Sequence, residues 1–513
     1  MKPFKAATFQ LSVLAIAVML VLAGCSNNNA KSEPSASAES SKTSQPPDGK
    51  GEGELPPVEL TWYYGTGQQQ PDQQVVEDAV NKYLKDNTRL NATVKLKPID
   101  FGSYDQKLNV AIASNDPMDI VWTTQSWLLK YQENIKKGAF LALDDLLPQY
   151  APKVFNEVMP QKYWDDVRAD TDGKIYAVPS YQLAAKAFGF VFQKRFVDKY
   201  GFDISTVKTE ADLEPFLETL KKNEPGMIPF AFRPEDNGIA DPDLRDYAGY
   251  ITYNKNDPFK ALNYYETPQY KAFLDLMHSW YQKGYIYQDS ATVKDWNEFF
   301  RKGNVAVTTD VTSKPGADAE FPAANGGHET VSRTITSPIF YGVTATMNAI
   351  SSKSKNPERA MMFLELVNTD QELYRLLSYG LKGKHYEDQD GYYKKADNSA
   401  YAPDIFWVFG NPNLSLLSPG QPKDLFDQIR EYNEAAEVPP MTGFHFDDSN
   451  LKTEMAAVNA VKGEYIIPLQ TGTADPNVVL PKFLEALKKA GYDKILAELN
   501  KQLAEWADKN GKK

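Results

Sequence analysis

The chain of 513 residues is poor in the side chains that most often build disulfides and metal sites. It has one cysteine, Cys25, so no disulfide can form within the chain and no site can be built from several cysteines. Its histidines stand far apart in the sequence, which gives no indication of a histidine cluster: they are His278, His328, His385 and His445. We therefore expect neither a metal nor another cofactor.

Positive charge and long apolar runs are scarce as well. The sequence has 56 Lys and Arg residues against 68 Asp and Glu residues, a net charge of −12, and no basic patch is visible. Nucleic acid is therefore not an expected partner, because binding it needs clustered positive charge. After the N-terminal segment, no apolar run approaches the roughly 20 residues that span a bilayer.

Recognisable catalytic motifs are missing too: the sequence has no G-x-S-x-G, no phosphate-binding loop and no H-E-x-x-H. We therefore predict that the protein is not an enzyme. A cell-surface glycoside-active enzyme stays an alternative, because 68 acidic residues allow many pairs of carboxylates at the roughly 5 to 10 Å that hydrolysis needs. Two Asp-Gly loops, at residues 170–173 and 388–391, lack the flanking ligands of a calcium loop and are predicted to be turns.

The N-terminus has the layout of a secretory signal, with two lysines before the apolar run Leu11–Ala23. The run ends in Leu22-Ala23-Gly24-Cys25, which resembles the bacterial lipobox. This resemblance implies cleavage just before Cys25 and a lipid on its thiol. We expect residues 1–24 to be a signal peptide and the lipid to be the only membrane anchor, on the extracellular face of the cell membrane. The alternative is an uncleaved anchor with a buried free cysteine.

The segment after the signal is built differently from the rest of the chain. Between Cys25 and residue 57 it consists mostly of Ser, Asn, Glu, Lys, Pro and Gly, which cannot bury a core. We predict that residues 25–57 are a lipidated cysteine followed by a disordered tether. The remaining body, residues 58–513, is too long for one core and should form two or three domains.

The body begins with a pattern that alternates strands and helices. Residues 58–64 and 94–96 read as strands, residues 76–84 and 104–112 as helices, and Asp119–Trp122 as a third strand. Such an alternation predicts a parallel sheet, in which ligands gather at the carboxyl ends of the strands. Three successive aromatics cannot all face one side of a strand. The candidate ligand contacts at these ends are Trp62, Tyr63, Tyr64 and Trp122.

Seven short segments of the body occur in the order that one family of proteins shows. They are Asp119–Trp122, Gly173–Pro179, Val191–Lys194, Phe299–Ala306, Ser352–Ala360, Tyr379–Tyr386 and Gly472–Pro476. With them the chain resembles the extracellular solute-binding lipoproteins of bacterial ABC importers. More narrowly, it is similar to the Bacillus and Paenibacillus group that carries the domain of unknown function 3502 at its C-terminus.

The resemblance implies an α/β fold of the two-lobe, type II periplasmic-binding-protein kind. Each lobe would be a mixed or parallel sheet flanked by helices, with the ligand in the cleft between them. We expect one lobe to comprise residues 58–185 and about 340–400. The other would comprise residues 186–339 and about 401–513, including the closing helices.

The resemblance also implies a function. The protein would act as a monomer that delivers a small solute, a carbohydrate or an oligosaccharide, to the separate permease subunits of an ABC transporter. A peptide-binding or sensory lipoprotein, or a scaffold without a small ligand, stays an alternative.

Further candidate ligand contacts lie in predicted loops and lobe crossings. Tyr181, Gln182 and Tyr341 fall at the crossings, where residues line the cleft or simply pack in the hinge. Trp407 lies in an aromatic loop and is a candidate stacking surface. Arg233, beside a proline, is a candidate clamp for a carboxylate, with a surface salt bridge as the alternative.

Burial in the core is an alternative role for two further tryptophans and the main role expected for one face of the last helix. Trp127 and Trp296 are candidate stacking residues, although both also fit the buried side of a helix. At the C-terminus, apolar residues at helical spacing predict a helix with one buried face: Tyr492, Ile495, Leu496, Leu499, Leu503 and Trp506.

Overall fold

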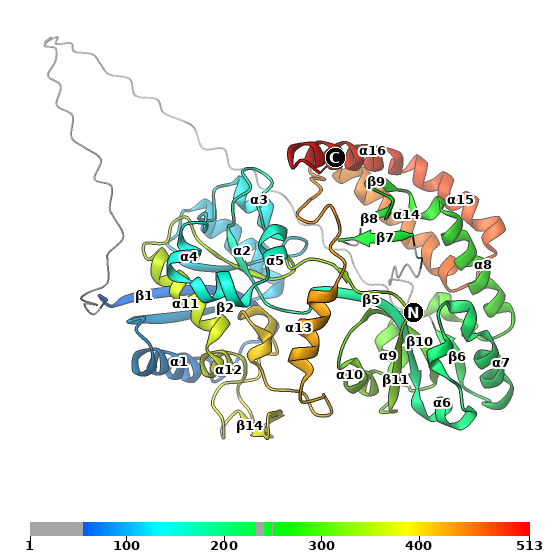
Figure 1. Cartoon of the computed structure of the whole chain (residues 1–513), viewed down its shortest axis with the longest axis horizontal. Coiled ribbons are helices and arrows are strands. Elements are labelled where there is room, and N and C mark those ends of the chain that lie inside the picture. Colours follow the sequence, from blue (N-terminus) through cyan, green and yellow to red (C-terminus); the bar gives the residue numbers. More distant parts are fainter. Residues whose placement is uncertain (1–54, 232–240, 242, 249, 513) are drawn as a thin grey trace, which may run out of the picture. The chain divides into compact units, whose positions relative to one another are not determined.

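The computed structural model describes residues 55–231, 241, 243–248 and 250–512 (Figure 1). The chain separates into two units, residues 1–53 and 54–513, and the described residues all belong to the second. The predicted signal peptide, Cys25, most of the predicted tether and Arg233 lie outside the described residues. Within the described ranges, no helix is both long and apolar enough to cross a membrane.

The first sheet has five strands in the order β2-β1-β3-β13-β4. They are β1 (Val58–Thr66), β2 (Ala92–Asp100), β3 (Ile120–Thr123), β4 (Ala177–Pro179) and β13 (Met347–Ile350). Strand β1 is parallel to β2 and to β3, as the alternation of strands and helices predicts. Helix α1 (Gln73–Asn87) and helix α2 (Phe101–Ala113) form the two crossovers.

Strand β13 lies between β3 and the edge strand β4 and is antiparallel to both. It returns the chain to the first sheet after more than 150 residues spent elsewhere. Helix α11 (Pro357–Thr369) then begins with Pro357 after Asn356, as the sequence predicts. Its apolar side is buried against the sheet: Ala360, Phe363, Leu364 and Val367.

The second sheet has four strands in the order β11-β5-β10-β6. They are β5 (Ala185–Gln193), β6 (Ile228–Ala231), β10 (Val305–Ser313) and β11 (Thr330–Thr334), and the short β12 (Ile339–Phe340) also pairs with β5. Strand β10 is antiparallel to β5 and parallel to β6, so this sheet is mixed. Its core is rich in phenylalanine, with Phe188, Phe190 and Phe192 alternating along β5.

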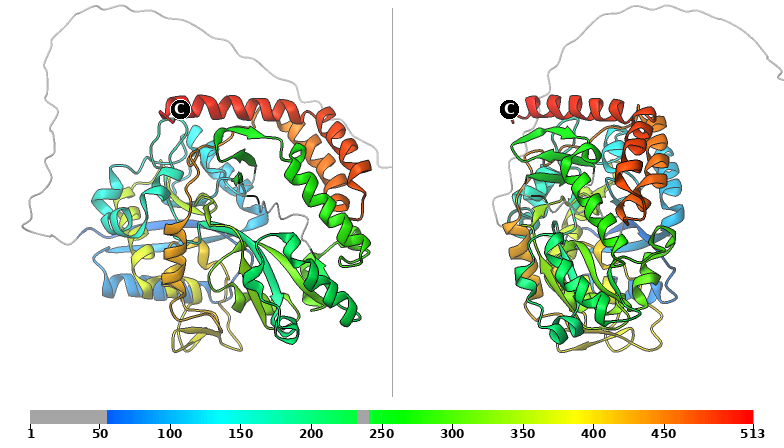
Figure 2. Two further views of the ribbon diagram at one scale, coloured as in Figure 1. Left: turned by 45° about the vertical axis from the view of Figure 1, so that its right-hand side comes forward. Right: turned by 90° about the vertical axis from the view of Figure 1, so that its right-hand side faces the viewer.

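The C-terminal helices pack on a third group of elements. These are the antiparallel strands β7 (Leu244–Tyr247), β8 (Ile251–Asn254) and β9 (Asp257–Leu262), and helix α8 (Pro268–Gln282). Helices α14 (Lys452–Gln470) and α15 (Pro476–Lys489) lie against α8, and α16 (Tyr492–Lys509) lies along β9 (Figures 1 and 2). The side chain of Asn500 on α16 bonds to both backbone groups of Ala261 on β9, at 2.8 and 3.0 Å.

The remaining described helices and strands connect these parts. They are α3 (Tyr131–Lys136), α4 (Leu146–Tyr150), α5 (Gln161–Asp166), α6 (Lys194–Tyr200), α7 (Glu214–Asn223), α9 (Trp296–Arg301), α10 (Ala317–Ala324), α12 (Gln371–Tyr379), α13 (Leu425–Ala435), β14 (Tyr386–Gln389) and β15 (Tyr392–Lys395).

The largest buried core surrounds the first sheet, and part of it comes from late in the chain. Residues of segment 401–436, which the sequence analysis assigned to the other lobe, are buried in this core: Tyr401, Ile405, Val408, Phe409 and Ala436. Hydrogen bonds explain the placement, because Asn348 on β13 donates to the Val408 carbonyl oxygen at 2.9 Å. The chain therefore adds to the first core before it reaches the C-terminal helices.

Candidate functional site

Four aromatic rings meet at the carboxyl edge of β3. The ring of Trp122, on β3, lies 5.9 Å from the ring of Phe101, 5.9 Å from Trp127 and 5.8 Å from Trp407, between centroids. Phe101 also contacts Trp127 at 4.9 Å and stacks on Trp407 at 6.1 Å. We call these four residues the aromatic cluster. Trp122 forms the base of the cluster and is fully buried, whereas Trp127 is 51% exposed.

Each outer ring of the cluster is held by a local feature of the chain. Phe101 begins α2 and passes so close to β1 that a Cβ atom on Gly65 would lie 2.4 Å from the ring. Trp127 follows a turn in which the Thr124 hydroxyl oxygen accepts the Trp127 and Leu128 amides, at 3.0 and 2.9 Å. The exposed indole is therefore presented by a fixed turn.

Trp407 is placed by strand β13. The Trp122 indole N–H donates to the Thr346 hydroxyl at 2.8 Å, and that hydroxyl donates to the Trp407 carbonyl oxygen at 3.3 Å. One threonine therefore connects the buried ring to the loop that carries Trp407. Both outer tryptophans rest on Trp122, and the cluster offers a stacking surface on a rigid support.

Two of the three successive aromatics on β1 belong to the core. Trp62 and Tyr64 share one face of the strand and are buried, and the Trp62 indole donates to Asn348 Oδ1 at 2.9 Å. Edge contacts with Phe363 and Phe409, both at 5.5 Å, complete the surroundings of Trp62. These rings are buried because that face of β1 packs against α11 and the 401–436 segment.

Tyr63 points to the opposite face of β1 and is half-buried. Burial, together with the nearby carboxylates of Asp116 and Asp119, raises the pKa of its hydroxyl. Tyr63 is thus the member of the triplet that lies on the other face of the sheet, as expected for at least one of three successive aromatics. Its neighbours Asp116 and Asp119 precede β3, whereas the aromatic cluster lies where β3 ends.

The crossing residues predicted from the sequence do lie where the chain passes between the sheets. Tyr181 is almost fully buried against Tyr163, with ring centroids 5.4 Å apart. The Gln182 carbonyl oxygen accepts a hydrogen bond from Asn433 at 3.0 Å. Tyr341 is half-buried, and the Lys186 ammonium lies 3.3 Å from the centre of its ring.

Trp296 lies in a different part of the structure. It begins α9 and packs on Phe299 with centroids 5.3 Å apart, in the small apolar cluster around Phe300 and Val305. That surrounding fits the interpretation of Trp296 as a packing residue.

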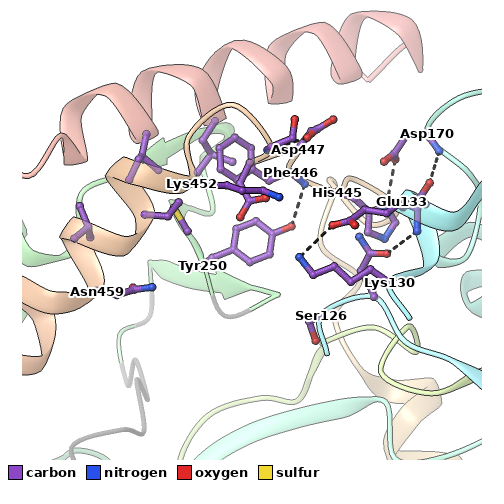
Figure 3. Close-up of a pocket in the computed structure, with 18 of the residues that line it drawn as sticks. Ser126, Lys130, Glu133, Asp170, Tyr250, His445, Phe446, Asp447, Lys452 and Asn459 are labelled. Atoms are coloured by element: carbon purple, nitrogen blue, oxygen red, sulfur yellow. Dashed lines mark hydrogen bonds and ion pairs between the residues drawn. The ribbon is translucent and has the colours of Figure 1, made fainter. Parts of the chain in front are cut away.

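A cavity of about 640 Å³ is lined in part by Ser126, the residue that directly precedes Trp127 of the aromatic cluster (Figure 3). One wall consists of residues from the part of the chain that includes α3: Gln125, Ser126, Lys130, Gln132, Glu133, Lys136, Lys137 and Asp170. The opposite wall consists of Tyr250, Leu262 and a larger set from residues 445–499. Sequence reasoning missed this cavity, since its lining residues come from segments more than 300 positions apart. The buried face predicted for the last helix is confirmed by Ile495, Leu499 and Leu503, and its first turns also line the cavity.

Several ion pairs cross this cavity or lie along its wall. Lys136 Nζ is 2.5 Å from Asp447 Oδ2, and this bond lowers the pKa of Asp447 to about 2. Lys130 is paired with Glu133 at 3.2 Å. Asp447 comes from the C-terminal region and Lys136 from α3, so their pair connects the two walls.

His445 makes a second connection between the walls. Its Nδ1 lies 3.2 Å from Asp170 Oδ1, and the amide of Gln132 lies 3.5 Å from the same nitrogen. Burial lowers the pKa of His445, but the bond to Asp170 and the charges of Asp170 and Asp166 outweigh it, so the pKa is raised overall.

Asp166, behind His445, is fully buried at the end of α5. Burial raises the pKa of its carboxyl, although nearby His445 opposes this. The carboxylate accepts hydrogen bonds from the Val343 amide at 2.7 Å and from the Tyr247 hydroxyl at 3.2 Å. Asp166 thereby joins the crossing before β13 to strand β7.

No group of three or more His, Cys, Asp or Glu side chains arranged to hold a metal ion is found among the described residues. The two Asp-Gly loops are turns: Gly391 donates its amide to Asp388 Oδ1 at 2.7 Å, and the Lys174 amide donates to Asp172 at 3.1 Å.

Comparison with known proteins identifies the class. The family of bacterial extracellular solute-binding proteins matches residues 78–380, more than half of the chain, and the protein belongs to this family. A domain of unknown function, DUF3502, matches residues 440–508. Both agree with the resemblance that the sequence motifs indicate.

Individual relatives are moderately similar. A carbohydrate ABC transporter substrate-binding protein of Streptococcus pneumoniae is 28% identical over 442 residues, covering 83% of this chain and 86% of its own length. Lipoprotein LipO of Bacillus subtilis is 21% identical over 331 residues, covering 60% and 64%.

Among solved structures, the N-glycan transport solute binding protein NgtS of Streptococcus pneumoniae is 26% identical and has a TM-score of 0.72, covering 88% of this chain and 99% of that one. Complexes of NgtS with Man1GlcNAc and with Man5GlcNAc have TM-scores of 0.62 and 0.58. The predicted two-lobe α/β fold is confirmed by these neighbours. Proteins of this family carry solutes and do not transform them, as predicted for this chain.

Proposed function

We propose that this protein captures a carbohydrate outside the cell and delivers it to the permease of an ABC importer. The observation that carries the proposal is the exposed Trp127 ring, held by a fixed turn at the carboxyl edge of parallel strands. The flat face of a sugar ring carries C–H groups that stack on an indole, while its hydroxyls bond to polar neighbours. Two relatives, a carbohydrate substrate-binding protein and an N-glycan transport protein, support the same class of solute.

In this proposal Trp127, Trp407 and Phe101 contact the sugar, and Trp122 supports them from below. Tyr341, with Lys186 over its ring, is the contact proposed at the crossing. Ligand capture would close the two lobes by a hinge motion at the crossings.

The division into lobes follows the buried cores. We assign residues 58–185 and about 340–436 to the lobe of the first sheet, since residues up to Ala436 are buried in its core. Residues 186–339 and about 437–513 form the other lobe together with the C-terminal helices. The protein would work as a monomer, with the permease and its ATPase as separate chains.

The membrane attachment is part of the same proposal. A lipid on Cys25 would hold the protein at the extracellular face of the membrane, and residues 26–57 would serve as its tether. The lipobox-like end of the N-terminal apolar run and the similarity to a lipoprotein of Bacillus subtilis support this.

A thermal-shift screen tests the proposed solute class. The chain without residues 1–24, carrying Cys25→Ala, is heated with monosaccharides, neutral oligosaccharides and peptides. A ligand that binds only the folded state stabilises it by about 2.7 kcal/mol at a hundredfold excess over Kd, so a binding sugar raises Tm. A response to peptides with none to sugars contradicts the carbohydrate proposal. Hydrolysis of an oligosaccharide during incubation contradicts the assignment as a carrier.

A further inference from the structure

The region of unknown function supplies most of the cavity described above. More than half of the residues that line the cavity fall between 440 and 508, the range of DUF3502. They come from the loop around His445, from helix α14 and from the start of helix α16. The facing wall is the segment 125–137 of the solute-binding family domain. The cavity therefore exists only where the two matched regions meet.

This cavity is continuous with the aromatic cluster along the chain. Gln125 and Ser126 line the cavity, and the next residue, Trp127, carries the exposed ring of the cluster. The same threonine turn holds all three positions, since Thr124 accepts the Trp127 amide at 3.0 Å. A chain-like ligand stacked on Trp127 would therefore extend past Ser126 into the cavity. Its volume of about 640 Å³ is that of a small-molecule pocket.

The chemistry of the cavity suits a neutral ligand with many hydroxyl groups. Five lysines and four carboxylates line it, and the best-placed charges are paired, as in Lys130–Glu133 and Lys136–Asp447. Paired charges place hydrogen-bond donors and acceptors side by side without a large net charge. A hydroxyl group both donates and accepts, so it can bond to such a pair. Apolar side chains also line the cavity, Leu262 and Met455 among them, and can contact the C–H surface of a sugar.

The wall from the region of unknown function is also fixed in place. Asp447 and His445 are bound to Lys136 and Asp170 of the first lobe, at 2.5 and 3.2 Å. The Phe446 amide between them donates to the Tyr250 hydroxyl at 3.4 Å (Figure 3). These contacts already hold residues 445–447 against residues 136 and 170, so closure of the lobes would start from walls that touch.

We propose that this cavity is a second saccharide subsite, by which residues 440–508 take part in binding and extend the recognised solute from a single sugar to a neutral oligosaccharide. The inference rests on the proposed function, because it places one end of the solute on the aromatic cluster. It adds that the length of the solute is read by the region of unknown function.

A substitution that fills the cavity tests the subsite. Asn459 lines the cavity from an exposed position on α14, so Asn459→Trp blocks it at little risk to folding. The matched control is Glu464→Trp, at an exposed position of the same helix outside the cavity lining. Dissociation constants are measured for short and long partners: Man1GlcNAc and Man5GlcNAc, maltose and maltohexaose, cellobiose and cellohexaose, xylobiose and xylohexaose.

If the subsite exists, the unaltered protein should bind the long partner of at least one pair more tightly than the short one, by about tenfold or more in Kd. One or two extra net hydrogen bonds would give a difference of this size. Asn459→Trp should remove this advantage and leave the short partner unchanged, and Glu464→Trp should keep it. Equal affinities in every pair, or an advantage that survives Asn459→Trp, overturn the subsite while the proposed carbohydrate function stands. Absence of any sugar response in the thermal-shift screen overturns both.

Discussion

Replacing Trp127 with alanine removes the most exposed ring of the aromatic cluster. Its ring packs on Phe101 at 4.9 Å and on Trp122 at 5.9 Å, and 51% of the residue is open to solvent. We therefore expect the free energy of unfolding to fall by only about 1 kcal/mol. A sugar stacked on the open face loses a tryptophan contact of about 2 kcal/mol, which weakens its Kd about thirtyfold.

The base of the cluster should respond in the opposite way. Trp122 is fully buried and donates to Thr346, so Trp122→Ala leaves a large cavity and removes one hydrogen bond of the Thr346 hydroxyl, at a cost of about 3 to 5 kcal/mol in folding stability. Calorimetric titration with the best sugar of the thermal-shift screen measures affinity, and urea unfolding measures stability. Trp127→Phe serves as the conservative control and should keep part of the affinity. Unchanged sugar binding by Trp127→Ala would refute the reasoning that makes this ring the stacking surface.

Other predictions concern the charges, the packing and the anchor. The pKa of His445 is raised in the folded state, so the stability from its pair with Asp170 is fully present below about pH 6.5 and is lost as pH rises through the folded-state pKa. The free energy of unfolding should therefore fall over that range in the unaltered protein and fall less in His445→Gln. Urea titration at several pH values measures this difference. Gly65→Ala should cost about 1 to 3 kcal/mol and weaken sugar binding, since the new methyl would displace Phe101; a variant with normal stability and affinity would contradict this. Cys25→Ala should move the protein from the membrane fraction to the medium, as immunoblots of the two fractions would show, and its retention on the membrane would rule out the lipid as the only anchor.

Part of the site could be predicted from the order of strands and helices. The pattern of residues 58–122 indicates a parallel sheet whose carboxyl ends hold the ligand, and Trp122 does end at that edge. Trp407 was a candidate because its loop is aromatic, and it lies in the cluster. Phe101 escaped notice, since a phenylalanine at the start of an amphipathic helix looks like any other core residue.

Exposure is what the sequence could not assign. Trp62 and Trp127 are the same residue type, yet one is enclosed by Phe363 and Phe409 and the other is half open. Which ring is enclosed depends on α11 and on the segment 401–436, which reach the first sheet from hundreds of positions away. Local periodicity carries no information about partners at that distance.

By itself, the sequence determined the alternation of strands and helices, the parallel pairing of β1 with β2 and β3, and the family, because these depend on local propensity and on the order of short motifs. Only the tertiary structure decided which aromatic rings face solvent and where the cavity lies. The cluster joins residues 101, 122, 127 and 407, and the cavity joins α3 to α16. Such sites arise when long-range packing brings distant segments together, and that packing depends on the whole buried surface at once.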